Sequence, residues 1–130
     1  MNIESPKVSV AKSPQELYDF LTNVENFEKL MPENISKFEV LAEGKFLFAI
    51  KGMPEIVLKL QESTPTSQVV LGAASDKLPF TLTGNIEETG EGKSDAQLVF
   101  EGKFNPMMAM MIKGPIGKFV NTLAENMSKL

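Results

Sequence analysis

One stretch of this sequence decides the predicted fold: Asn105-Pro106-Met107-Met108-Ala109-Met110-Met111-Ile112-Lys113-Gly114-Pro115-Ile116-Gly117, which continues to Leu130. Apolar residues recur in it at three- and four-residue spacing, which predicts a long helix with one apolar face. They are Met108, Ile112, Ile116, Phe119, Leu123 and Met127. The start of this helix is marked by Asn105, which can cap free amides, and by Pro106, which suits the first helical position.

Gly114-Pro115 predicts a division of this helix, because proline has no amide to offer to the Met111 carbonyl and disfavours helical geometry in the residue before it. After the division, the apolar stripe is regular and is typical of packing against a sheet. Before it, residues 106–113 contain four methionines in five positions, which cannot all face inward on one helix. We therefore expect a core helix preceded by a separable, partly exposed gate.

The composition indicates one globular domain spanning residues 1–130, of ordinary hydrophobic content. The net charge is -4, from 17 acidic residues against 13 basic residues that are all lysine. Arginine is the main residue for bidentate recognition of guanine and phosphate, so its absence argues against nucleic acid as a partner. Without a signal segment or an 18-residue apolar run, we expect a cytoplasmic protein with no stable membrane insertion.

Cysteine and histidine are both absent. Their absence excludes thiol nucleophiles, imidazole general bases and zinc sites with nitrogen or sulfur ligands. No metal-loop, dinucleotide or phosphate-loop spacing occurs either, so we predict no metal and no cofactor.

Before this helix, the sequence predicts a strand, two short helices and six strands. The first short helix has a capping box in Ser13-Pro14-Gln15-Glu16, and the second ends at Pro32. From residue 35 to 104, apolar and polar residues alternate between short turns, which is typical of an antiparallel meander. The predicted fold is therefore α+β, with a curved antiparallel sheet of about seven strands wrapped around the long C-terminal helix.

Three short motifs accompany this order of elements: Ser13-Pro14-Gln15-Glu16-Leu17-Tyr18-Asp19-Phe20-Leu21, Asn26-Phe27-Glu28-Lys29-Leu30-Met31-Pro32 and Gly114-Pro115-Ile116-Gly117-Lys118. Together they resemble the START-like (SRPBCC, helix-grip) superfamily, in particular its branch of polyketide cyclase/dehydrase-like proteins and proteins similar to a small carbon monoxide dehydrogenase component. The resemblance covers nearly the whole chain. It implies the helix-grip fold and a function among those the superfamily hosts, which include carriers and cyclases.

In a meander, alternate turns lie at the same end of the sheet. One end is therefore expected to gather six of the eight methionines, with Leu78 and Phe104: Met31, Met53, Met107, Met108, Met110 and Met111. Methionine is flexible and polarizable, so it suits an adaptable mouth to an apolar cavity, although it also serves as a filler in ordinary cores. By parity, the inner face of the sheet is almost wholly apolar: Phe38, Val40, Phe48, Ile50, Ile56, Leu58, Leu71, Phe80, Leu82, Leu98 and Phe100.

The function predicted from these features is binding or carriage of a hydrophobic small molecule such as a lipid, an isoprenoid or a polyketide-like compound. The predicted ligand-binding residues are Phe48, Ile50, Leu58, Leu71, Phe80, Leu82, Phe100, Phe104, Met53, Met107, Met108 and Met111. One alternative is a cyclase or dehydratase. It needs a titratable group inside the cavity, and only Glu55 and Asp76 lie near the mouth, so no catalytic residue is predicted. Another is an interaction module without a cavity, which predicts a homodimer contact through residues 107–111.

Overall fold

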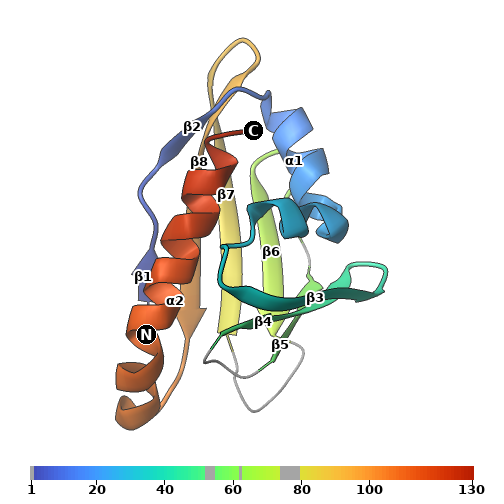
Figure 1. The fold of residues 1–130 in the computed structure, drawn as a ribbon. Coiled ribbons are helices and arrows are strands. Elements are labelled where there is room, and N and C mark those ends of the chain that lie inside the picture. The colour runs from blue at the N-terminus through green and yellow to red at the C-terminus, as the bar shows by residue number, and fades with distance from the viewer. Residues whose placement is uncertain (1, 52–54, 62, 74–79) are drawn as a thin grey trace.

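A curved antiparallel sheet and three helices make up the computed structural model, which describes residues 2–51, 55–61, 63–73 and 80–130 (Figure 1). The strands are β1 (Asn2–Glu4), β2 (Val8–Val10), β3 (Ile35–Ala42), β4 (Lys45–Ile50), β5 (Ile56–Leu60), β6 (Gln68–Ala73), β7 (Phe80–Gly90) and β8 (Lys93–Gly102). The helices are α1 (Pro14–Thr22), the 3-10 helix η1 (Val24–Leu30) and α2 (Pro106–Met127). The three helices lie together on one face of the sheet (Figure 1). This is the α+β architecture predicted from the sequence.

The eight strands form one sheet in the order β1-β8-β7-β6-β5-β4-β3, with β2 also paired to β8. From β3 to β8 each strand pairs with the next, as expected of a meander. The predicted first strand is divided into β1 and β2 at Ser5 and Pro6. Proline has no amide for the ladder, and the buried Ser5 hydroxyl accepts a hydrogen bond from the Leu98 amide at 2.9 Å. One predicted strand thus becomes two short edge strands.

The first helical region forms as the capping signal predicts. The Ser13 hydroxyl accepts a hydrogen bond from the Glu16 amide, and the Glu16 carboxylate accepts one from the Ser13 amide, each 3.2 Å long. These two bonds satisfy donors that a helix N-terminus otherwise leaves free. Two residues after α1 begins the 3-10 helix η1, whose buried residues Val24, Phe27 and Leu30 face the core.

The terminal helix α2 also begins as predicted, since the Asn105 side chain accepts a hydrogen bond from the Met108 amide at 2.8 Å. The predicted division at Gly114-Pro115 was wrong: α2 runs unbroken from Pro106 to Met127. Gly114 lacks the Cβ that would crowd the proline ring, and the exposed turn leaves the Met111 carbonyl accessible to water. None of the helices formed by described residues is long and apolar enough to cross a membrane.

The core lies between the sheet and the helices and contains a row of stacked aromatic rings. Ring centroids are 5.3 Å apart for Phe27 and Phe46, 6.0 Å for Phe46 and Phe48, and 5.0 Å for Phe48 and Phe119. The row therefore joins η1, β4 and α2 across the interior.

Val40 departs from the predicted inner face, because its side chain is 38% exposed. It lies in the second half of the edge strand β3, next to a register shift between Val40 and Ala42. Most of that half of the strand extends beyond the cover of the helices, so alternation continues there without burial.

Candidate functional site

A groove of about 460 Å³ lies between α2 and the part of the sheet where β3 begins and β4 ends. Its lining comes from three places in the sequence: the segment between η1 and β3, the end of β4, and the middle of α2. The lining residues are Pro32, Asn34, Ile50, Lys51, Gly114, Pro115, Lys118, Phe119 and Thr122. The groove thus separates the sheet from the C-terminal helix, which is where the sequence predicts a ligand cavity.

Apolar side chains from both walls line the groove. Ile50 on β4 and Phe119 on α2 are only 4% and 5% exposed, and Pro32 is buried beside them. Phe119 is also the last ring of the aromatic row, so the groove reaches inward as far as its contact with Phe48. A hydrophobic molecule in this groove would therefore meet the edge of the core.

Hydrogen bonds hold the walls of the groove in place. The Lys51 amide donates to the Asn34 carbonyl over 3.0 Å, which ties the end of β4 to the segment before β3. The Asn126 side-chain amide donates to the Leu30 carbonyl over 2.8 Å, which ties α2 to the end of η1. Because these bonds join segments far apart in the sequence, the groove is a product of tertiary structure.

Two glycines lie within α2, and no neighbouring atom lies within 4 Å of a Cβ built at either Gly114 or Gly117. Glycine in a helix interior costs about 1 kcal/mol relative to alanine. Packing within the described chain therefore does not require glycine at these positions. Gly114 lines the groove and Gly117 does not, so only a side chain at position 114 would project from the groove wall.

The structure divides the predicted ligand-binding residues among three environments. Six are buried in the core: Phe48, Ile50, Leu58, Leu71, Leu82 and Phe100. Three are half-buried against the core: Phe80, Phe104 and Met108. Met107 and Met111 are exposed, and Met53 lies outside the described residues. Among all of these only Ile50 lines the groove, so a role for the others in ligand binding stays a prediction.

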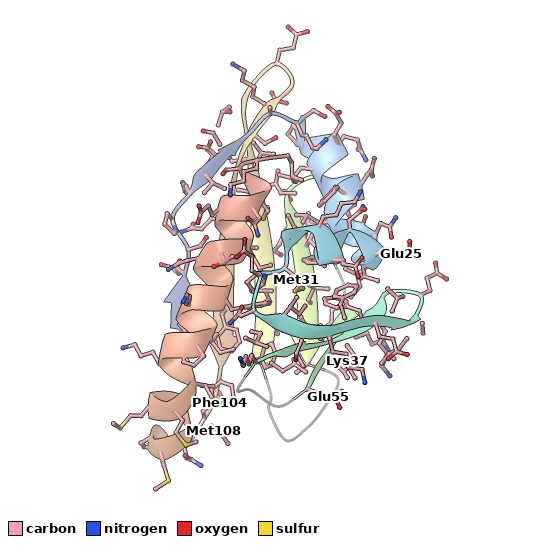
Figure 2. The ribbon with its side chains drawn as sticks, viewed as in Figure 1. Glu25, Met31, Lys37, Glu55, Phe104 and Met108 are labelled. Carbon is pink, nitrogen blue, oxygen red and sulfur yellow. The ribbon has the colours of Figure 1, made fainter. Side chains whose placement is uncertain are left out.

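The first turns of α2 expose three methionines, as their crowding in the sequence led us to expect. Met107, Met110 and Met111 are 75%, 83% and 69% exposed. Met108 points toward the sheet side, where Phe104 stacks on Phe100 at 6.2 Å. Met31 does not lie beside them, because Figure 2 shows it near the end of η1, far along α2 from Met108. The expected gathering of methionines therefore does not include Met31.

Titratable groups are placed mainly at the surface. Glu55 forms an exposed ion pair with Lys37 at 3.1 Å, and the two are seen near the open end of the sheet in Figure 2. Asp76 lies outside the described residues. Among the residues the structure describes, the buried polar or charged ones are Ser5 and Ser94, and no group of acids is arranged to hold a metal. The described part of the groove thus offers no pair of groups for acid–base chemistry.

Lys51, Lys118, Asn34 and Thr122 were not predicted as site residues. Alternation in the strands and helical periodicity assigned the lysines to the solvent face, which is correct for each element taken alone. What brings them to one groove is the way α2 crosses the sheet. The signal that could have indicated the helix wall was the exposed Gly114-Pro115 pair in the middle of an otherwise regular helix.

No protein-family model matches the chain, and no curated protein matches its sequence. Solved structures do match it. A START superfamily protein from Mycobacterium smegmatis is 15% identical and superposes with a TM-score of 0.76, over 98% of this chain and 94% of that one. The chain has the START-like fold. The similarity expected from the sequence motifs is thus confirmed at the level of fold.

Two further structures show how widely this START-like fold is used. A di-domain ARO/CYC protein, BexL, from a biosynthetic pathway is 11% identical with a TM-score of 0.73, and the match covers 99% of this chain and 45% of that one. The Aha1 dimer from Colwellia psychrerythraea is 18% identical with a TM-score of 0.58, over 100% and 99% of the two chains. At these identities the likeness concerns the fold, and function has to be argued from the groove.

Proposed function

We propose that this START-like chain binds and carries a hydrophobic small molecule in the groove between α2 and the end of β4. The observation that carries the proposal is the pairing of Ile50 and Phe119, two buried apolar side chains that face the same groove from sheet and helix. Its volume of about 460 Å³ falls within the range of small-molecule sites. The ligand class is a lipid, an isoprenoid or a polyketide-like compound.

The exposed methionines extend this apolar path along α2. Met111 lies four residues before Pro115 and seven before Lys118, so the three positions share one face of the helix. Met111 is exposed, which leaves it accessible to a ligand that approaches the groove along the helix. The predicted methionine mouth is therefore retained in the proposal as the surface formed by Met107, Met110 and Met111.

A matched pair of glycine substitutions tests the proposal. Gly114→Leu places a branched side chain in the groove, and Gly117→Leu places the same side chain one turn away on the same helix, outside the groove lining. Each variant is titrated with the neutral fluorescent dye Nile red, after thermal unfolding has shown that it folds. We expect Gly114→Leu to weaken dye binding at least about tenfold, or about 1.4 kcal/mol, and Gly117→Leu to leave it nearly unchanged.

Equal dye affinity in all three proteins would overturn the proposal, as would a wild-type protein that binds no Nile red. Native mass spectrometry of the protein purified from the cells that make it adds an independent test. A co-purifying apolar compound that is retained by Gly117→Leu and lost by Gly114→Leu is the expected result.

A second candidate function is favoured by the exposure of Met107, Met110 and Met111. Contiguous exposed apolar residues also form protein interfaces, and a homodimer would cover them. Sedimentation velocity of wild type and Met110→Glu separates the two functions. A dimer that is lost in Met110→Glu would support the interaction module, and a monomer in both would exclude that dimer.

A further inference from the structure

We infer that the groove takes an amphiphilic anion, whose apolar part contacts Ile50 and Phe119 and whose acid group is bound by Lys51 and Lys118. This inference rests on the proposed function and adds the charge of the ligand to it. A carboxylate and a phosphate monoester share the required chemistry, since each is an anionic group with several acceptor oxygens.

The charges that line the groove are unusually one-sided for this chain. Its described lining residues include two lysines and no aspartate or glutamate. The whole chain has the opposite balance, with 17 acidic and 13 basic residues. Two positive charges at one small apolar groove therefore run against the net charge of -4.

The two lysines come from different walls. Lys51 follows the last residue of β4, and Lys118 lies on α2 directly before Phe119. Each ammonium group therefore adjoins one of the two buried apolar residues, since Lys51 follows Ile50 in the chain. This arrangement combines an apolar floor with hydrogen-bond donors on both sides of it, which is the requirement for a ligand with an apolar body and an acid group.

Neither lysine has an ion-pair partner among the described residues. The three ion pairs that these residues form are Lys7–Glu87, Lys37–Glu55 and Lys129–Glu125, all away from the groove. Residues 102–124 moreover contain Lys103, Lys113 and Lys118 and no acidic residue, so α2 supplies no internal counter-charge near position 118. The local field thus favours an anion from outside the chain.

The expected energy is modest, because both lysines are exposed. Exposed ion pairs are weak, and about 3- to 10-fold in affinity is a reasonable sum for two of them. Salt screens such charges over about 3 Å at 1 M, so the contribution should largely disappear in concentrated salt. This salt dependence separates the lysine contribution from that of the apolar floor.

Competition against Nile red tests the inference, with decanoate, decyl phosphate and decanol below their micelle-forming concentrations. The three competitors share one alkyl chain and differ only in the head group. The variant Lys51→Gln/Lys118→Gln removes both groove lysines. The control Lys103→Gln/Lys113→Gln removes the same charge from the same region outside the groove lining.

We expect the groove variant to weaken displacement by decanoate about 3- to 10-fold at low salt and to leave decanol unchanged. The control variant should change decanoate by less than about twofold, and decyl phosphate should follow decanoate if either acid is accepted. A decanoate affinity that both variants, or neither, reduce would overturn the inference. Wild type that binds Nile red and decanol but not decanoate would overturn it while leaving the proposed function standing. Failure of Nile red to bind at all would overturn both.

Discussion

The ring of Phe119 on α2 stacks on the ring of Phe48 on β4, with centroids 5.0 Å apart and planes only 6° from parallel. This contact is the point at which the C-terminal helix meets the middle of the sheet. It also separates the groove from the interior, because Phe119 belongs both to the groove lining and to the core.

Removing this ring should be costly. We expect Phe119→Ala to lower the free energy of unfolding by about 3–5 kcal/mol, since it deletes buried contacts and leaves a cavity. Phe119→Leu should cost less, because it keeps an apolar side chain at that position. Urea denaturation followed by circular dichroism measures both. A loss below about 1 kcal/mol for the alanine variant would show that the stack contributes little to stability.

The capping box predicts a pH dependence that can be assigned to one carboxyl group. The Ser13 amide donates to the Glu16 carboxylate and holds the pKa of Glu16 below its usual range, with a smaller effect from the Ser13 hydroxyl. A carboxyl whose pKa is lowered on folding stabilises the protein above its unfolded pKa, about 4.3 for glutamate, and this stabilisation is lost as pH falls through the folded pKa. Glu16→Gln should therefore be less stable than wild type at pH 7.

The same pair should approach equal stability near pH 3, because protonated glutamate and glutamine are then both neutral. Glutamine also keeps a side-chain oxygen that can serve in a capping box, so the comparison isolates the charge. Urea denaturation at the two pH values checks this. A difference that stays constant with pH would show that charge plays no part.

A single substitution in α2 should stabilise the protein. Gly117→Ala adds a methyl group with no neighbouring atom within 4 Å of it and removes the entropic cost of glycine in a helix. We expect the free energy of unfolding to rise by about 0.5–1 kcal/mol. Thermal unfolding by calorimetry measures the gain. An unchanged or lowered melting temperature would indicate that glycine is required there for a contact beyond the described residues.

Exposure predicts which methionines react with peroxide. Met107, Met110 and Met111 are 69–83% exposed and should be oxidised first by hydrogen peroxide, whereas Met127 is 1% exposed and should be protected. Peptide mass spectrometry over a time course measures the order. The melting temperature should change little as the three exposed residues react, because they make few contacts. Equal rates for Met127 and the exposed three would reveal opening of α2.

Much of the fold could be predicted from local signals. Ser13 and Glu16 form the predicted capping box, Asn105 caps α2, and the alternation from Phe46 to Ile50 places those side chains in the core. Such features depend on a few neighbouring residues and on the geometry of one element. They are therefore legible in a single sequence.

Other features depend on where elements end up in space. Val40 continues the alternation of β3 but extends past the helices, so parity alone placed it wrongly inside. Pro115 carries a strong break signal that the glycine before it relieves. The groove was located correctly between sheet and helix, but Lys51 and Lys118 meet there only because α2 crosses the end of β4. Periodicity assigns a face to a residue and cannot indicate which other element lies across from it.

The pairing of β1 and β2 with β8 has a consequence for the making of the protein. Asn2 pairs with Glu101 and Val10 with Ser94, so the first strands find their partner only after most of the chain has been synthesised. At about 5–20 residues per second, translation leaves Val10 unpaired for roughly 4–17 s. Val10 is a core residue in the finished fold. The newly made N-terminal segment therefore presents an apolar strand that a ribosome-associated chaperone could protect until β8 emerges.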